Sequence, residues 1–511
     1  MSPENFTDEQ RLIAKTASDF VVGEVLPHAE HLEKNHDYYL LRKLVKQAAE
    51  IGLTTADELG FVTGCLVAES TAKYSGFSGT FGVHSGVATH PIAWFGTPEQ
   101  KAKYLPKLES AEVIGAYCLT EPHAGSDALA ARTRADLSAD GRHYILNGQK
   151  MWITNGGFAD VFTVFAKVGG EKFTAFIVER AFGGVQSGAE ERKMGLHGSS
   201  TTPIYFQDCK VPVENVLGEI GRGHLIAFNC LNMGRLKLAA GALGGMKEIL
   251  KHAVRYAKER TAFGKPIACY GLIRQKLAEM AVRIYVTESM VYRTAGLIDA
   301  ALERNGGDKL KAMEEYAIEC SLNKIYASEA SNYCADECVQ IFGGYGYHAE
   351  YPAERAYRDV RPSRIFEGTN EINRLLATGM FLKRAMAGKV AFSLEMPEPA
   401  ETPLENLKLL FRVAAIPAVQ KYMTALADQQ EIVAALTNIM LEGFAAECVT
   451  LRSNADIAQV FTYEALHRAE LEARQIFAAL GHDAKVLKPF TRQEAVDTIG
   501  LRRGIAERVL G

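Results

Sequence analysis

The sequence predicts a mainly α-helical protein with a central β domain. Helical patterns run from Thr7 to about Leu108, and a stretch rich in β-branched and aromatic residues continues to about residue 216. Long helical patterns return from Gly223 and are interrupted by one proline-rich segment. We therefore expect five parts: an N-terminal helical domain (1–113), a middle β domain (114–216), a helical bundle (217–389), a linker (390–403) and a C-terminal helical extension (404–511).

The expected N-terminal helices carry two start signals. The run TDEQ, which begins at Thr7, has the residues of a capping box. The run FGTPEQKAKYLPKL reads as a turn into a helix, with Pro98 near the helix start.

The middle domain is predicted from three strand-like runs. In HYILNGQKMWIT, residues 143–154, the Asn147-Gly148 pair predicts a hairpin turn between two strands. The runs DVFTVFAKV and KFTAFIVER are rich in the β-branched and aromatic residues typical of strands.

The helical pattern that follows has one buried face. Ile273, Leu277, Met280 and Ile284 recur at steps of three and four residues, which predicts a long helix packed in a bundle. The segment SLEMPEPAETPLEN then places three prolines among acidic residues, which is typical of a linker. The Ala- and Leu-rich remainder predicts a further, separate set of helices.

Composition excludes several classes of protein. With 48% apolar and 23% charged residues, the 511-residue chain has ordinary globular composition. A net charge of −4 lacks the overall positive charge that is typical of nucleic-acid-binding proteins. The nine cysteines form no C-x-x-C pair, so we expect no disulfide framework and no metal site. No signal segment and no apolar run of membrane-spanning length is apparent, which predicts a cytoplasmic protein.

Three motifs combine residues suited to chemistry, although each has a structural alternative. CLTEPHAGSDA, residues 118–128, gathers hydroxyl and carboxylate groups in a loop, but such a run also forms ordinary Asx and Ser turns. KMWITNGG, residues 150–157, contains one of the two tryptophans, and an isolated tryptophan in a strand is more often a core residue than a cofactor platform. RPSRIFEGTNEINRLL, residues 361–376, could be a solvated helix start with charge pairs.

Taken together and in order, these motifs resemble those of the acyl-CoA dehydrogenase family. FGTPEQKAKYLP, LTEPHAGSDA, WITNGG, RTAFGKPI, QIFGGYGY and RIFEGTNEI carry the resemblance, which spans nearly all of residues 1–388. The very-long-chain branch looks most similar, because it also has a helical region after the dehydrogenase core. The resemblance implies a β-barrel-like middle domain and a four-helix bundle.

The resemblance also implies a cofactor and a reaction. FAD would lie between the β domain and the bundle, next to a fatty acyl-CoA thioester. The enzyme would remove the α proton and a β hydride to form a trans-2-enoyl-CoA. Glu367 matches the catalytic base, and an apolar setting beside Phe366 should raise its pKa. Gly368 would let the backbone approach the substrate.

Further residues match family positions in the same way. Those implied to bind FAD are Thr120, Ser126, Trp152, Thr154, Arg260, Phe263, Gln275, Gln340, Gly344, Thr369 and Glu371. Five of these (Arg260, Phe263, Gln275, Gln340 and Gly344) would reach the FAD of a neighbouring subunit, so the resemblance implies a homo-oligomer, with a dimer favoured. Asn232 and Arg235 match substrate contacts near the CoA moiety. Electrons would pass to an electron-transferring flavoprotein.

Two alternatives to this function stay open. An acyl-CoA oxidase shares the fold, FAD and base but passes electrons to oxygen, and a non-catalytic scaffold could keep the fold alone. The loop TTADELG is shorter than in the family, and its effect on the nearby pocket is an open question. Weak membrane association through the C-terminal region also stays open, without a basic amphipathic helix to argue for it.

Overall fold

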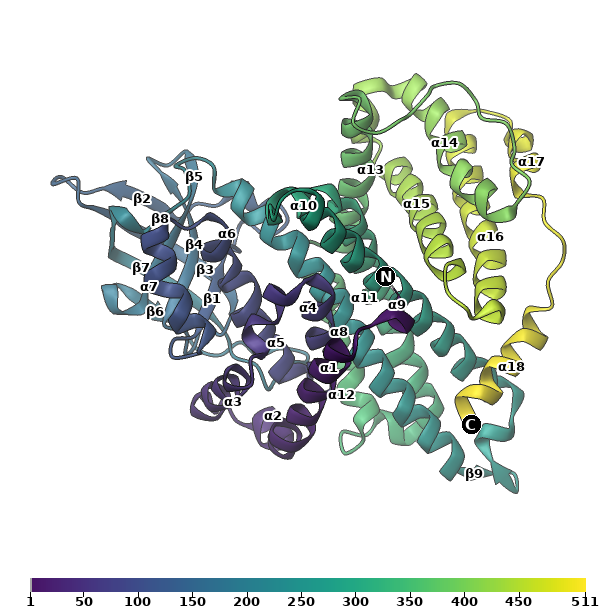
Figure 1. The fold of residues 1–511 in the computed structure, drawn as a ribbon, viewed down its shortest axis with the longest axis horizontal. Helices are drawn as coiled ribbons and strands as arrows, with labels where there is room; N and C mark the ends of the chain where they lie inside the picture. The colour runs from purple at the N-terminus through teal and green to yellow at the C-terminus, as the bar shows by residue number, and fades with distance from the viewer. Residues whose placement is uncertain (1) are drawn as a thin grey trace. The chain divides into compact units, whose positions relative to one another are not determined.

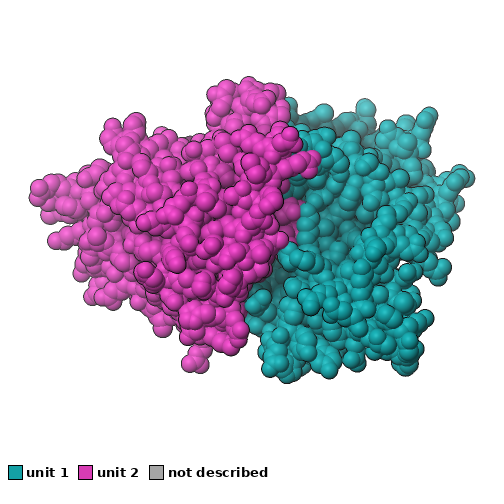
Figure 2. All heavy atoms as spheres, turned by 60° about the horizontal axis from the view of Figure 1, so that its bottom comes forward, with its two compact units in different colours: residues 1–6, 246–297, 316–511 teal, residues 7–245, 298–315 magenta. Residues whose placement is uncertain are grey.

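The computed structural model describes residues 2–511 and divides into two compact units. Unit 1 comprises residues up to Phe6, Met246–Leu297 and Tyr316–Gly511, and unit 2 comprises Thr7–Gly245 and Ile298–Glu315. The ribbon is drawn in Figure 1, and Figure 2 colours unit 1 teal and unit 2 magenta. The predicted fold class, mainly helical with a central β domain, is confirmed.

Unit 2 begins with short helices that carry the predicted start signals. Thr7 and Thr97 both accept a hydrogen bond from the backbone N–H three residues later, and both form complete capping boxes with Gln10 and Gln100. The helices are α1 (Asp8–Phe20), α2 (Ala29–Lys34), α3 (Tyr38–Glu50), α4 (Phe61–Thr71), α5 (Ser75–Val83), α6 (His90–Phe95) and α7 (Pro98–Glu109). Apolar residues from α1 to α5 share one core with the strands that follow.

The strands of unit 2 form one mixed sheet. In chain order they are β1 (Gly115–Cys118), β2 (Arg134–Leu137), β3 (His143–Thr154), β4 (Val161–Val168), β5 (Lys172–Glu179), β6 (Val185–Ser187), β7 (Thr201–Pro212) and β8 (Val216–Leu217). The spatial order is β6-β7-β3-β2-β4-β5-β8, and β1 pairs with β4 in parallel. No pairing between the described strands joins β6 to β8, so the expected barrel-like form is an open sheet.

The hairpin predicted at Asn147-Gly148 is wrong, because residues 143–154 form the single strand β3. The register against β7 shifts between Leu146 and Gly148, so the turn-like pair forms a β-bulge. A Cβ at Gly148 would lie 2.5 Å from Thr133 Oγ1, which explains why glycine is needed there. The Asn147 side chain pairs across the sheet with Asp208 instead of capping a turn.

The long helices that follow confirm the predicted periodicity. They are α8 (Gly223–Glu259), α9 (Gly271–Arg304), α11 (Ala317–Phe342) and α13 (Asn370–Met386), with the short α10 (Lys309–Glu315) and α12 (Pro352–Val360) between them. The small strands β9 (Thr261–Ala262) and β10 (Lys265–Pro266) join α8 to α9. On α9, Leu277, Met280 and Ile284 are buried as the pattern predicts.

The C-terminal helices complete unit 1. They are α14 (Pro403–Tyr422), α15 (Gln430–Thr450), α16 (Ala455–Leu480), α17 (Lys488–Thr491) and α18 (Thr498–Leu510). Their apolar residues form one continuous core with buried residues of α9, α11 and α13, such as Val286, Ile325 and Ala377. The extension therefore does not pack as a body by itself.

One helix corrects the expectation that no segment has the length and apolarity of a membrane span. Helix α15 (Gln430–Thr450) passes that test by length and composition, with a mean hydropathy of 1.5. In this structure 67% of its most apolar window is buried. Its neighbours α14 and α16 contribute to the same core, so burial within a helical bundle accounts for its apolar character.

Candidate active site

Glu367 lies in a strained turn immediately before helix α13. Its backbone has a φ of 59°, in the left-handed region that non-glycine residues rarely adopt, and Gly368 follows with a φ of 81°. Thr369 then caps α13 by accepting a hydrogen bond of 3.2 Å from the Ile372 N–H. Such strain persists only where the surroundings enforce it, and it is concentrated at functional sites.

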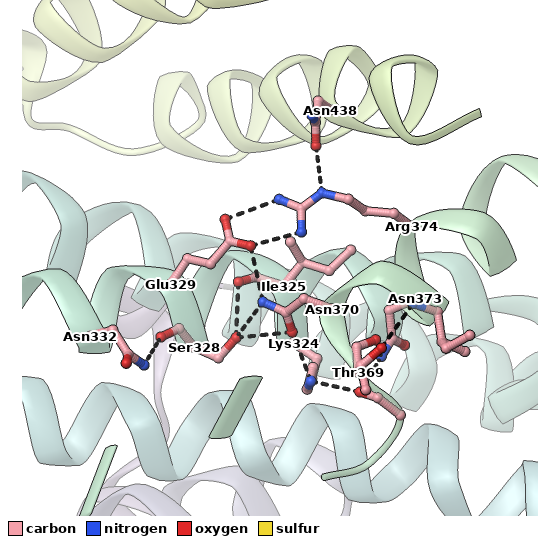
Figure 3. Close-up of polar contacts among 12 residues, drawn as sticks. Lys324, Ile325, Ser328, Glu329, Asn332, Thr369, Asn370, Asn373, Arg374 and Asn438 are labelled. Atoms are coloured by element: carbon pink, nitrogen blue, oxygen red, sulfur yellow. Dashed lines mark hydrogen bonds and ion pairs between the residues drawn. The ribbon is translucent and has the colours of Figure 1, made fainter. Parts of the chain in front are cut away.

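Hydrogen bonds from two side chains hold this turn in place (Figure 3). Lys324, on α11, donates to the Gly368 carbonyl at 2.7 Å and to Asn370 Oδ1 at 2.7 Å. The Asn373 amide donates to the carbonyls of Gly368 and Thr369 at 2.8 and 3.0 Å. Lys324 and Asn373 are fully buried, so water does not compete for these contacts.

The remaining residues of this motif are more accessible. Glu367 and Thr369 are half-buried, while Phe366 is 46% exposed. Glu371 is exposed, and a hydrogen bond from its own backbone N–H, helped by the Thr369 hydroxyl, lowers its pKa from the ordinary value. Accessible side chains, those of Phe366 and Glu371, therefore lie on either side of the half-buried Glu367.

A second group of predicted residues lines an aromatic cavity in unit 1. The cavity has a volume of about 460 Å³ and contains Arg260 and Gly344 among its lining residues. Tyr256 and Phe342 stack in its wall with ring centroids 4.0 Å apart, and the Arg260 guanidinium lies over the Tyr345 ring at 5.8 Å. A flat aromatic wall with a cation suits a nucleotide base attached to phosphate.

The structure does not gather every residue of this group into one cavity. Gln275 lines a different, larger cavity of about 910 Å³, whose other residues come from α9, α11, α16 and α18. Gln340 is exposed, and Phe263 is 96% exposed with a left-handed φ of 50°. An apolar ring fully exposed on a strained backbone is the kind of group that a partner or ligand covers.

In unit 2, Trp152 occupies an irregular position in strand β3. The register against β7 shifts between Lys150 and Ile153, and Trp152 has a left-handed φ of 58°. The bulge turns the indole outward, so that 61% of it is exposed. This excludes the alternative that Trp152 is a core residue. Thr154, two residues further, is half-buried.

The loop that follows β1 lies beside this bulge. The Thr120 carbonyl accepts a hydrogen bond of 2.9 Å from the Met151 N–H, and Ser126 is exposed near the loop tip. The structure thus brings the motifs that contain Thr120 and Trp152 together in one unit.

Sequence reasoning missed the ion pair that fastens this loop. Lys150 Nζ lies 2.6 Å from Glu121 Oε1, and the two side chains are 0% and 4% exposed. Glu121 also accepts hydrogen bonds from the N–H groups of Arg132 and Thr133. Burial opposes its charged form, but the Lys150 ammonium and the Arg132 N–H outweigh burial and lower the pKa of Glu121. Glu121 and Lys150 both lie within the sequence motifs, but only their buried contact in the structure shows that they fasten the loop.

The two predicted substrate residues form a buried pair on α8. Arg235 donates to Asn232 Oδ1 at 2.8 Å, and their exposures are 4% and 8%. A further polar cluster, which the sequence did not indicate, forms at the 3-10 helix Leu53–Leu59 before α4. There Asp57 contacts His90 Nε2 at 2.9 Å and also pairs with Lys237 of α8.

Comparisons with known proteins agree with these motifs. Profiles described as acyl-CoA dehydrogenase N-terminal, middle and C-terminal domains match residues 7–112, 116–209 and 221–379. A further profile, also described as an acyl-CoA dehydrogenase C-terminal domain, matches residues 406–487, within the helical extension. Together these profiles cover most of the chain.

Individual relatives show the same pattern. A probable acyl-CoA dehydrogenase of Bacillus subtilis is 44% identical, covering 94% of this chain and 89% of the relative. The very long-chain specific acyl-CoA dehydrogenase of Bos taurus is 46% identical over 65% of this chain, which spans 51% of that enzyme. The crystal structure of a Bacillus anthracis acyl-CoA dehydrogenase complexed with FAD has a TM-score of 0.95 and 43% identity, covering 100% of this chain and 96% of that one.

Proposed function

The chain belongs to the acyl-CoA dehydrogenase family of oxidoreductases, and from that premise we propose that it desaturates a fatty acyl-CoA to the trans-2-enoyl-CoA. The observation that carries the proposal is the strained, rigidly held turn at Glu367. A C–H group next to a thioester is a very weak acid, so its base must be fixed at contact distance.

We propose FAD as the cofactor, because the described side chains fit it. Trp152 and Phe263 present exposed rings on strained backbone, and the cavity at Arg260 and Gly344 combines aromatic walls with a cation. When bound, FAD supplies an acceptor for the hydride from the β carbon. Thr120, Ser126, Thr154, Thr369 and Glu371 would contact FAD, and Gln275 and Gln340 would contact the FAD of a neighbouring subunit.

Glu367 is the proposed catalytic base. Its carboxylate would take the α proton of the thioester, and its backbone N–H would stabilise the negative charge that develops on the thioester oxygen. Gly368, next to it, carries no side chain that would keep the substrate away. Asn232 and Arg235 would contact the CoA moiety, with Asn232 fixing the guanidinium of Arg235.

Three features of this proposal go beyond the family assignment. They are fatty acid β-oxidation as the pathway, an electron-transferring flavoprotein as the acceptor, and a homodimer whose subunits share FAD contacts. The dimer is supported by the full exposure of Phe263, which a partner subunit would cover. The cytoplasmic location and weak membrane association stay predictions.

The first test is the visible absorbance of the purified protein, recorded anaerobically before and after addition of palmitoyl-CoA. A flavin band that bleaches shows a bound flavin and a competent base in one step. A colourless protein that cannot be loaded with FAD contradicts the proposal and favours a scaffold. Reoxidation by oxygen, compared with reoxidation by an electron-transferring flavoprotein, separates an oxidase from a dehydrogenase.

The variant Glu367→Gln tests the base. We expect it to retain FAD and to lose the bleaching by more than about a hundredfold in rate, because the amide cannot accept the α proton. Glu350→Gln, an exposed glutamate upstream, is the matched control and should bleach normally. Normal bleaching in Glu367→Gln removes Glu367 from its role.

A further inference from the structure

We propose that the C-terminal extension positions the catalytic base: Thr437 and Asn438 of α15 fix Arg374 of α13, and Arg374 in turn fixes the turn that carries Glu367. The inference rests on the proposed function, since it assigns a role in the same site. Thr437 and Asn438 are not proposed to touch substrate or cofactor, so they are positioning residues. Figure 3 shows Arg374 with its contacts to Asn438 and Glu329.

The first link joins the turn to α11. Asn370, the first residue of α13, donates to Ser328 Oγ at 3.1 Å and to Glu329 Oε1 at 3.0 Å. Its Oδ1 accepts a hydrogen bond from the Lys324 ammonium, which also donates to the Gly368 carbonyl. A shift of the first turn of α13 would therefore break contacts that define the backbone just after Glu367.

The second link is a two-pronged ion pair between α13 and α11. Arg374 Nη1 lies 2.8 Å from Glu329 Oε1, and Nη2 donates to Glu329 Oε2 at 3.0 Å. The Arg374 side chain is only 17% exposed. Paired contacts of this planar kind fix orientation as well as distance. Glu329 thus holds Arg374 and Asn370 with the same carboxylate.

The third link comes from the extension. Arg374 Nε donates to Asn438 Oδ1 at 2.7 Å, and the Thr437 hydroxyl donates to the Arg374 carbonyl at 2.5 Å. Asn438 is itself held, because its amide donates to Glu472 of α16 at 2.8 Å. Adjacent residues of α15 therefore bind both the side chain and the backbone carbonyl of Arg374.

These contacts do more than attach the extension. The shared apolar core already attaches α14–α16 to the bundle, and apolar packing is non-directional. The polar contacts instead converge on one residue of α13, Arg374, about one and a half turns after the Thr369 cap. They fix the rotation of α13 about its axis and its position along that axis. The turn that carries Glu367 leads directly into this helix. Misplacement of a catalytic group by about 1 Å can cost about a hundredfold in rate.

The test uses the full-length holoenzyme with Asn438→Ala and Thr437→Val. We expect the rate of anaerobic bleaching at saturating acyl-CoA to fall about tenfold or more in the double variant. Flavin content and KM should stay near those of the parent. The apparent pKa of the base in the pH profile of kcat/KM should move, because the surroundings of Glu367 change.

Two further variants separate positioning from loss of stability. Glu447→Gln removes a different contact of α15, with Lys408 and with Arg293 of α9, and should change Tm without a loss of rate. The pair Asn438→Asp with Glu472→Gln rebuilds an acceptor for Arg374 and a donor from residue 472. With Thr437 unchanged, this variant should keep most of the parent rate, whereas Asn438→Ala alone should be slower.

The outcomes are distinct. Normal bleaching in Asn438→Ala with Thr437→Val overturns the inference. It is also overturned if Glu447→Gln lowers Tm and loses as much rate as that double variant. If Glu367→Gln itself bleaches normally, the proposed function fails instead. A tenfold loss in Asn438→Ala with Thr437→Val, together with a near-parent rate in Asn438→Asp with Glu472→Gln, supports the role of the extension.

Discussion

At the scale of single residues, backbone strain marks the candidate site. Eight described non-glycine residues have positive φ, and Trp152, Phe263 and Glu367 are among them. These three come from separate motifs, yet each is a residue for which the sequence suggested a role in catalysis or FAD binding. Strain costs about 1–3 kcal/mol at each such residue, so its coincidence with these motifs argues that the site is built for function.

The buried Lys150–Glu121 pair allows a prediction at the same scale. Lys150→Met should destabilise the protein by about 3–5 kcal/mol, because it leaves the Glu121 carboxylate buried without its cation. Adding Glu121→Gln should recover part of the loss, since the amide oxygen can still accept the Arg132 and Thr133 N–H groups. Thermal unfolding of the three proteins checks this, and an unchanged Tm for Lys150→Met contradicts it.

At the scale of elements, strand β3 shows how an irregular position serves a site. Two register shifts interrupt its pairing with β7, one at Gly148 and one that includes Trp152. The second shift turns the indole of Trp152 outward. In a regular strand, side chains alternate between the two faces of the sheet, so the neighbouring residues would have fixed the direction of the indole. A strand with a local defect can therefore present a ring that a regular strand would not.

Gly148 gives the prediction for this element. Gly148→Ala should destabilise the protein by about 1–3 kcal/mol, because its Cβ would lie 2.5 Å from Thr133 Oγ1 and 2.7 Å from Thr133 Cα. Gly82→Ala on α5, where nothing lies within 4 Å, is the control and should leave Tm unchanged or slightly raised. Equal Tm values for the two variants would show that the bulge can adjust.

At the scale of the whole molecule, the shared core makes the extension part of unit 1. Buried residues of α9, α11 and α13 pack directly against α14, α15 and α16. Arg293 of α9 and Arg374 of α13 add polar contacts with α15. Removal of the extension would therefore expose one face of the helical bundle to which Glu367 belongs.

Truncation after residue 389 tests this dependence. We expect the shortened chain to aggregate or to melt at a lower temperature than the full chain, because Val286, Ile325 and Ala377 would lose their apolar cover. Size-exclusion chromatography and thermal unfolding provide the measurement. A soluble truncated chain with the parent Tm would show that the extension only rests on the bundle.

Local pattern in the sequence was enough to predict the order of helical and β regions, the capping box at Thr7, the helix start near Pro98 and the family motifs around Glu367. Such features depend on residues close together in the chain, so local pattern reveals them. Three features became visible only in the folded chain: Asn147-Gly148 is a bulge, Trp152 is exposed and Lys150 pairs with Glu121. A fourth is that Asn438 reaches Arg374. These depend on contacts between residues distant in the chain, and local preference yields to such contacts.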